Sequence, residues 1–301
     1  MTKRVIAVGI AVMDKIFSVP AIPDEPIKVF ATGYSEIGGG PAATGAVTVA
    51  RLGGEAVLWA RVGDDPVGRR IVEELGEWGV RPRIRLVPGA RSGVSGVLVD
   101  KDGERLIIAF ADPGLDTDPA WLPLAEVAAA DAVLADMRWP RASEIVLDAA
   151  RAAGVPAVLD ADLASDDVAH RLVARSDYAV FSRPALTRFA GTDDVAEGLR
   201  AAAQVCPGRV GVTLGGEGFA WLEEESLARE PGFTVETVDT LGAGDVFHGA
   251  FALAIAEGRD MRAAARFANA ASALKCTRRG GRAGIPDRAE VAALMSLSEE
   301  V

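Results

Sequence analysis

Short apolar runs alternate with longer alanine-rich segments along most of this chain. Continuous apolar runs are typical of strands buried on both faces, and alanine-rich segments that stop at glycine are typical of helices. The expected strands are Val5–Val12, Ala56–Val62, Ala132–Ala135, Val155–Leu159, Tyr178–Phe181, Val210–Leu214 and Gly218–Leu222. The expected helices are Pro41–Leu52, a segment from Asp64-Asp65-Pro66 to Trp78, Ala142–Ala153, Gly244–Ala256 and Met261–Lys275. This alternation predicts an α/β fold with a mostly parallel sheet and helices on both faces.

Two regions contain short strand patterns without helices between them. These patterns are Lys15–Val19 with Lys28–Tyr34, and Val94–Val99 with Arg105–Phe110, where Asp102-Gly103 is typical of a hairpin turn. They predict a small antiparallel β sheet, which is either a lid over a site or an extension of the central sheet. We expect residues 1–13, 36–90 and 114–301 to form the α/β body, and residues 14–35 and 91–113 to form the lid.

Composition and charge narrow the possible functions. The chain has 301 residues and a net charge of −11. This negative charge repels the phosphates of a nucleic-acid backbone, so we expect no nucleic-acid partner. No apolar run is long enough to span a membrane, and the run at Val5 stops too early for a signal peptide. We therefore expect a cytoplasmic protein. Neither the two cysteines nor the two histidines have metal-ligand spacing.

The segment Asp239-Thr240-Leu241-Gly242-Ala243-Gly244-Asp245 precedes an apolar helical pattern. A glycine-rich turn that opens a helix leaves backbone N–H groups free, and with the helix dipole these groups favour an anion such as phosphate. Asp245 would then lie beside the bound anion. It can accept a proton from an attacking hydroxyl group, or it can simply cap the helix.

A second glycine segment, Gly38-Gly39-Gly40-Pro41, also precedes a helical pattern. It predicts either a backbone that approaches a ligand closely or a tight loop that needs small residues. The two segments together resemble the two signatures of the ribokinase-like (PfkB) family of carbohydrate kinases, and the resemblance covers essentially the whole chain.

The resemblance implies a lid-covered α/β kinase that uses ATP and Mg²⁺ to phosphorylate a sugar hydroxyl. It implies Asp245 as the catalytic base, with the backbone of Gly242, Ala243 and Gly244 holding the transferred phosphoryl group. It implies sugar binding by Asp14, Gly39, Gly40 and Thr44, and nucleotide binding by Ser182, Thr213, Gly215, Gly218 and Asn269. From the residues alone, Asp14 can also form a turn, and a buried Asn269 can have a purely structural partner.

Two features of the resemblance concern metal ions. Asp239 and Thr240 match positions near a monovalent-cation site in some members, so an ion such as K⁺ is a possible cofactor. Ser182 and Ala185 stand where the family commonly has Asn and Glu, which support Mg²⁺. The metal ligands are therefore unknown.

One subgroup, the 6-deoxy-6-sulfofructose kinases, resembles this chain in more stretches than the generic signatures, including Val12-Met13-Asp14 and Leu274-Lys275-Cys276-Thr277. That resemblance implies an acidic ketose phosphorylated at O1, with Lys28 and Arg138 binding the sulfonate. Ala109 departs from this pattern because the subgroup has Asn there. From the residues alone, Lys28 and Arg138 are ordinary surface cations, and another ketohexose, a ketose phosphate or a pentose stays open.

Other classes of protein fit the sequence less well. A nicotinamide dehydrogenase would have its glycine motif directly after the first strand, and a P-loop kinase would contain Gly-x-x-x-x-Gly-Lys. A non-catalytic sugar-binding regulator is favoured only if Asp245 is absent. Apolar lid residues, including Ile16, Phe17, Val29 and Phe30, predict a homodimer that pairs lid against lid.

Overall fold

The computed structural model describes residues 2–101, 104–115 and 118–297. In these residues the main sheet has nine strands, in the order β13-β12-β11-β10-β9-β8-β1-β4-β5. Their bounds are β1 Arg4–Val8, β4 Glu55–Gly63, β5 Arg81–Val87, β8 Ala132–Asp136, β9 Ala157–Ala161, β10 Tyr178–Ser182, β11 Arg209–Thr213, β12 Phe219–Glu223 and β13 Ser226–Glu230. All neighbours pair parallel except β11–β12 and β12–β13, which pair antiparallel.

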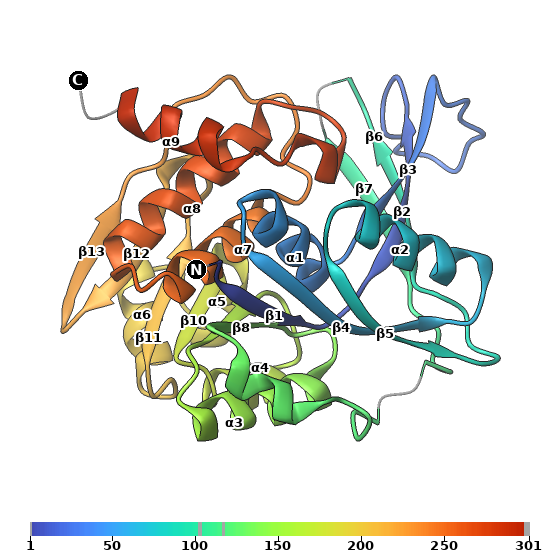
Figure 1. Cartoon of the computed structure of the whole chain (residues 1–301). Helices are drawn as coiled ribbons and strands as arrows, with labels where there is room; N and C mark the ends of the chain where they lie inside the picture. The colour runs from blue at the N-terminus through green and yellow to red at the C-terminus, as the bar shows by residue number, and fades with distance from the viewer. Residues whose placement is uncertain (1, 102–103, 116–117, 298–301) are drawn as a thin grey trace.

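Helices cover both faces of this sheet (Figure 1). One face packs against α1 Pro41–Arg51, α2 Pro66–Glu77, α7 Ala243–Ala256, α8 Met261–Cys276 and α9 Arg288–Leu297. The other packs against α3 Pro140–Ala153, α4 Asp166–Val173, α5 Arg183–Ala190 and α6 Val195–Ala203. Short 3₁₀ turns are η1 Leu124–Ala129, η2 Gly215–Glu217 and η3 Gly281–Gly284. The expected α/β fold is confirmed, and no helix in the described ranges has the length and apolarity needed to cross a membrane.

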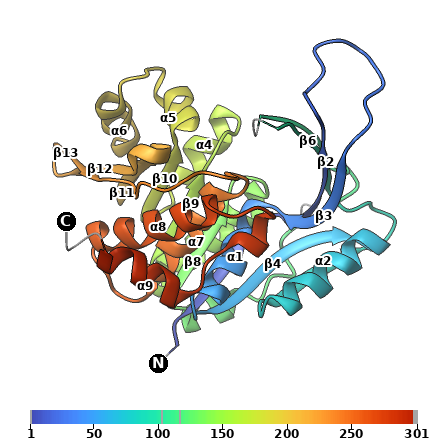
Figure 2. The same cartoon turned by 90° about the horizontal axis from the view of Figure 1, so that it is seen from above.

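A smaller sheet, which we call the lid, stands beside the main one. Its strands are β2 Val12–Ser18, β3 Gly33–Gly39, β6 Val94–Val99 and β7 Arg105–Phe110, in the order β3-β2-β6-β7. The pairs β2–β3 and β6–β7 are antiparallel as expected, whereas the central pair β2–β6 is parallel. Figure 2 shows the long β2–β3 connection projecting away from the main sheet.

Two strand predictions on the N-terminal side change in detail. The run Val5–Val12 is interrupted, because β1 ends at Val8 and β2 begins at Val12. The prediction of a strand at Lys28–Tyr34 is wrong: β3 begins at Gly33, and it pairs with β2 so that Gly38 and Gly39 lie opposite Met13 and Val12. The predicted turn Asp102-Gly103 lies outside the described residues.

The interruption after β1 has a clear cause in Asp136, which is 1% exposed at the end of β8. Its Oδ2 accepts hydrogen bonds from the backbone N–H groups of Ile10 at 3.0 Å and Ala42 at 3.2 Å. Its Oδ1 accepts from the N–H of Arg138 at 2.8 Å. One buried carboxylate therefore fixes the end of β1, the start of α1 and the end of β8. Ligands of open α/β sheets bind beyond these carboxyl ends of the strands.

Candidate active site

The N-terminus of α7 is the centre of the candidate site. Gly242 is its N-cap residue and has a φ of 74°, a left-handed conformation that favours glycine. The N–H of Ala243 donates to Thr240 O at 3.1 Å, whereas the N–H groups of the following first-turn residues have no acceptor within a helix. The ring nitrogens of His248 lie 2.7 Å from Gly244 O and 3.1 Å from Val180 O, which ties this first turn to β10.

A cavity on one side of this helix start, which we call the glycine cavity, is lined by both glycine segments. Its walls include Asp14, Gly39, Gly40, Thr44, Asp245 and Arg282. Asp14 Oδ1 accepts a hydrogen bond from Ser95 Oγ, which comes from β6 of the lid. A Cβ at Gly39 would stand only 2.2 Å from Asp14 Oδ2, so a larger residue there would displace the Asp14 carboxylate. The first glycine segment thus runs close to the Asp14 side chain, which agrees with both interpretations of this segment, approach to a ligand and tight packing.

A second cavity, of about 430 Å³, lies on the other side of the helix start and is called the groove here. It is lined by Thr213, Gly215, Gly218 and Asn269, together with Ala243 and Gly244 of α7. The Asn269 Nδ2 donates to the backbone oxygens of Glu230 and Pro231, each at 3.1 Å. Its buried amide therefore has structural partners while its side chain also lines the groove. The two cavities meet at the first turn of α7.

The electrostatics of the site centre on Asp245. Burial, followed by the nearby Asp160 carboxylate, raises the pKa of Asp245 to about 8, while His248 acts in the opposite direction. Burial also raises the pKa of Asp14, although its bond from Ser95 and the charge of Arg282 lower it. A carboxylate with a pKa near neutrality can accept a proton from a bound hydroxyl group and release it again.

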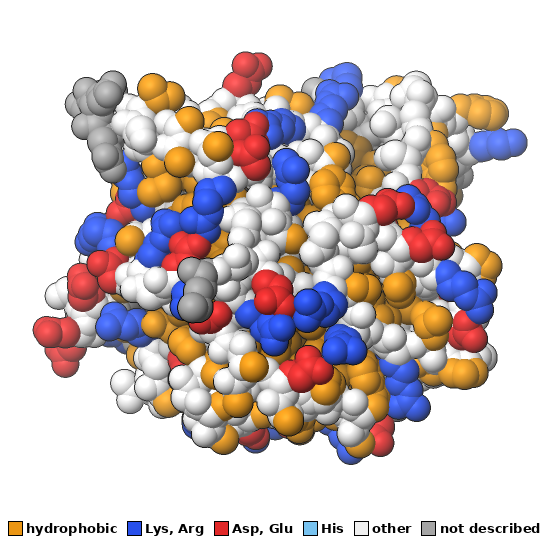
Figure 3. Space-filling view, viewed as in Figure 1, with side chains coloured by type: hydrophobic (Ala, Val, Ile, Leu, Met, Phe, Trp, Pro, Cys, Tyr) orange, Lys and Arg blue, Asp and Glu red, His pale blue; other side chains and the backbone are white. Residues whose placement is uncertain are grey.

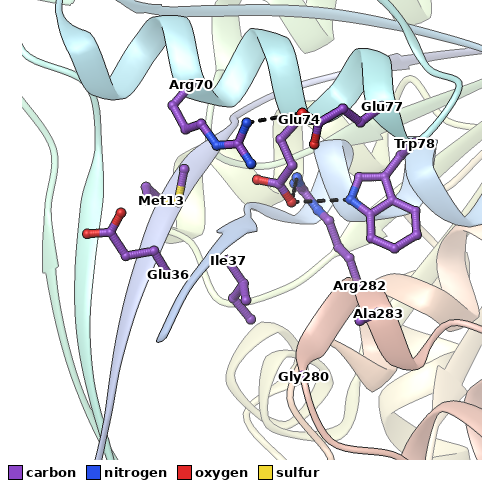
Figure 4. Close-up of a pocket in the computed structure, with 10 residues that line it drawn as sticks. All are labelled: Met13, Glu36, Ile37, Arg70, Glu74, Glu77, Trp78, Gly280, Arg282 and Ala283. Atoms are coloured by element: carbon purple, nitrogen blue, oxygen red, sulfur yellow. Dashed lines mark hydrogen bonds and ion pairs between the residues drawn. The ribbon is translucent and has the colours of Figure 1, made fainter. Parts of the chain in front are cut away.

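Arg282, on η3, is a site residue that the sequence argument did not single out. It is 2% exposed, and its Nη2 donates to Gly39 O at 2.9 Å. Figure 4 shows the Glu74 carboxylate pointing toward it, and Arg282 Nη1 lies 3.4 Å from Glu74 Oε1. Arg282 Nε has no hydrogen-bond partner among the described residues. The only signal for it in the sequence is that residues 280–286, after α8, also resemble the 6-deoxy-6-sulfofructose kinases.

Three other predicted residues are not among the described residues that line either cavity. Lys28 lies exposed in the β2–β3 connection, with its Nζ 5.4 Å from the centre of the Phe30 ring. The Arg138 guanidinium donates to Leu163 O at 2.8 Å and to Asp162 Oδ2 at 2.9 Å. Ser182 caps α5 and donates to Asp162 Oδ1 at 3.0 Å, although its strand neighbour Thr213 lines the groove.

The two implied metal ions fit the site differently. Within the described ranges, no group of three or more His, Cys, Asp or Glu side chains can hold a metal ion. Mg²⁺ would therefore depend mainly on the nucleotide phosphates, which commonly supply much of its coordination in such sites. A monovalent cation at Asp239 and Thr240 does not fit, because the side chains of Lys275 and Arg105 already contact their oxygens.

Known proteins are similar to this chain in sequence and architecture. A model of the pfkB family carbohydrate kinases matches residues 2–288. Ribokinase of Bacillus subtilis is 29% identical over 304 residues, which span 98% of this chain and 100% of that protein. A crystal structure from Agrobacterium tumefaciens, provisionally described as a ribokinase, is 41% identical and covers 100% of both chains with a TM-score of 0.96. Ribokinase of Arabidopsis thaliana, solved with ribose and ATP, is 28% identical and has a TM-score of 0.85, covering 98% of this chain and 99% of that one.

The family match includes α7, both glycine segments and every side chain described above in the two cavities. The solved structures share the main sheet and the lid across nearly the whole chain. Fold, glycine segments and sequence similarity lead to the same conclusion. This chain belongs to the pfkB family of carbohydrate kinases.

Proposed function

We propose that this enzyme transfers the γ-phosphoryl group of ATP to a hydroxyl group of a monosaccharide. ATP binds in the groove, the sugar binds against the residues that line the glycine cavity, and the reaction takes place between them at the first turn of α7. The observation that carries the proposal is the position of Asp245, which lines the glycine cavity next to groove residues Ala243 and Gly244. Similarity to ribokinases supports the same assignment.

In the proposed mechanism each residue has one task. Asp245 accepts the proton of the attacking hydroxyl group, and the backbone N–H groups of Gly242 and Gly244 stabilise the transferred phosphoryl group. The N–H of Ala243 joins them by exchanging its bond to Thr240 O for one to the phosphoryl group. Asp14, Gly39 and Gly40 orient the sugar hydroxyls. Mg²⁺, bound with ATP, would neutralise phosphate charge. The raised pKa of Asp245 suits its task, because a base whose pKa lies near the working pH accepts and returns a proton readily.

A pentose or ketohexose is our first candidate for the sugar, because the relatives include ribokinases, a deoxyribokinase and a fructokinase. An acidic ketose such as 6-deoxy-6-sulfofructose, phosphorylated at O1, is the second. Lys28 and Arg138 were the residues expected to bind its anionic group, but Arg138 is engaged by Asp162. Arg282 supports this candidate, because its buried guanidinium lines the glycine cavity and can attract an anionic group. Its Nε has no hydrogen-bond partner among the described residues.

The test is ADP release over a panel of ribose, deoxyribose, fructose, fructose 6-phosphate and 6-deoxy-6-sulfofructose. At least one sugar should raise ADP release well above the rate without sugar. Asp245→Asn is the control: it should still bind ATP but lose about 10²–10⁴-fold in turnover, the usual contribution of a general base. Preference for the sulfonated or phosphorylated sugar would select the acidic candidate. The proposal fails if no sugar stimulates ADP release or if Asp245→Asn turns over normally.

We further propose that the enzyme works in the cytoplasm as a homodimer joined through the lid. Several large apolar side chains of the lid and of its β2–β3 connection are exposed, including Ile108 of β7 at 67% and Phe30 of the connection at 77%. In Figure 3 hydrophobic side chains are visible at the upper right, where the β2–β3 connection lies in Figure 1. An exposed sheet edge with apolar side chains is a ready surface for pairing with a second chain.

A further inference from the structure

Lys275 is completely buried, with 0% of its surface exposed, near the C-terminal end of α8. Its Nζ donates to the backbone oxygen of Asp239 at 2.8 Å and lies 3.3 Å from Asp239 Oδ2. A buried ammonium group is costly unless it is paired and hydrogen-bonded. The contacts between Lys275 and Asp239 therefore fix the positions of both side chains. Asp239 begins the segment Asp239–Gly242, which we call the cradle loop because it ends at the N-cap of α7.

Asp239 also connects the cradle loop to its surroundings. Its Oδ1 accepts from the N–H of Leu241 at 2.9 Å, and its Oδ2 accepts from the N–H of Gly280 at 3.3 Å. The N–H of Asp239 itself donates to Cys276 O at 3.0 Å, beside Lys275 on α8. These contacts fix the backbone just before the first turn of α7, so they set the direction in which its N–H groups point.

Arg105 adds a second positive charge to this loop from the lid. Its Nη2 lies 3.3 Å from Asp239 Oδ1 and donates to Thr240 Oγ1 at 2.6 Å. One carboxylate thus faces two cations that belong to the chain itself. A third cation at Asp239 and Thr240 would compete for the same oxygens and would be repelled by both side chains at short range.

We propose that Lys275 is a built-in cation that holds the cradle loop in its active shape, so that phosphoryl transfer needs no added monovalent cation. This rests on the proposed function, because the cradle loop matters only if α7 holds a phosphoryl group. It replaces the expectation that an ion such as K⁺ binds at Asp239 and Thr240. Lys275 acts through the loop and is therefore a positioning residue.

The experiment compares the wild type, Lys275→Ala and Lys15→Ala in chlorides of K⁺, NH₄⁺ and tetramethylammonium at equal ionic strength. Lys15→Ala removes the same charge from the lid, where Lys15 pairs with Glu36 and is 40% exposed, and it should behave like the wild type. The wild type should show the same kcat/KM for ATP and the same melting temperature in all three salts. Lys275→Ala should lose about tenfold or more in kcat/KM in tetramethylammonium, in keeping with removal of one partner from a buried pair.

Rescue separates positioning from simple structural damage. K⁺ or NH₄⁺, each small enough to enter the space left by the ammonium group, should restore much of the activity of Lys275→Ala and raise its melting temperature. Tetramethylammonium is too large to do so. Activation of the wild type by K⁺, or a variant that responds equally to all three salts, would overturn the proposal. If Lys275→Ala does not fold, the test rests on whether kcat/KM and the melting temperature of the wild type are the same in all three salts. If no sugar is phosphorylated, the melting temperatures still test the cation site independently of the proposed function.

Discussion

At the scale of single residues, the burial of Asp245 in its ionised form lowers the free energy of unfolding. Its pKa is about 8 in the folded protein and 3.8 as the ordinary value, so the folded state binds its proton more tightly than the unfolded state does. The stabilisation from that proton is fully present below about pH 4 and is lost as the pH rises through 8. A buried carboxylate kept at such a cost is typical of a functional position.

We expect kcat/KM for the sugar to rise with pH and to level off above about 8, because Asp245 must lose its proton before it can act as the base. Initial rates between pH 6 and 9.5, at saturating ATP, measure this profile. A rate that is flat across that range would contradict the assigned pKa.

Asp245→Asn gives a control that does not depend on turnover. Asparagine cannot ionise, so the variant avoids the cost of an ionised, buried carboxylate. Its melting temperature relative to the wild type should therefore be higher at pH 9 than at pH 5, by a few degrees. Calorimetry at the two pH values measures the difference. An equal change at both would mean that Asp245 ionises as easily as an exposed carboxylate.

At the scale of elements, the glycine cavity depends on how β3 meets β2. The register places Gly38 and Gly39 at the end of β3, and Gly40 then caps α1 with a φ of 97°. Glycines that look like a loop in sequence are thus part of a strand, and they let the backbone pass close to Asp14 and Arg282. The lid and the main sheet share this junction, so substrate contacts arise where the two sheets meet.

Gly39→Ala tests this junction. The new methyl group would meet the Asp14 carboxylate at 2.2 Å, so Asp14 must move. We expect KM for the sugar to rise about tenfold or more, in keeping with roughly 1–3 kcal/mol for an overpacked site, while ATP affinity stays unchanged. Gly96→Ala is the matched control, because a Cβ at Gly96 of β6 meets nothing within 4 Å. If both substitutions change KM for the sugar equally, the close contact of Gly39 with Asp14 has no specific role in sugar binding.

At the scale of the whole molecule, the main sheet has helices on both faces, whereas the lid strand β7 is largely exposed. The β7 strand forms one edge of the lid, and consecutive residues Leu106, Ile107 and Ile108 are 43%, 55% and 67% exposed. Among the described residues no strand pairs with the outer side of β7, and a second lid would cover it.

Sedimentation at micromolar concentration should give twice the chain mass of 31.3 kDa. Ile108→Lys should weaken the dimer, because a charge on the edge strand opposes pairing with another chain. Leu297→Lys is the matched control: Leu297 is 66% exposed at the end of α9, outside the lid, and its replacement should leave the mass unchanged. A wild-type monomer at this concentration would reject the lid interface.

The sequence by itself determined the α/β alternation, both glycine segments and Asp245 as the central residue. These features are local: apolar periodicity reports burial, and a glycine turn before a helix reports free N–H groups. Thr213, Gly215, Gly218 and Asn269 were also within reach through family resemblance, and all four line the groove.

Only the tertiary structure decided which charges reach the site. Arg282 meets Gly39 from 243 residues away in sequence, and Arg105 meets Thr240 from 135 residues away. Of the two cations that sequence similarity favoured, Arg138 donates to Asp162, and Lys28 lies exposed near Phe30 in the β2–β3 connection. A long cationic side chain can reach several partners, and the choice among them depends on how distant elements pack, which no local pattern of residues records.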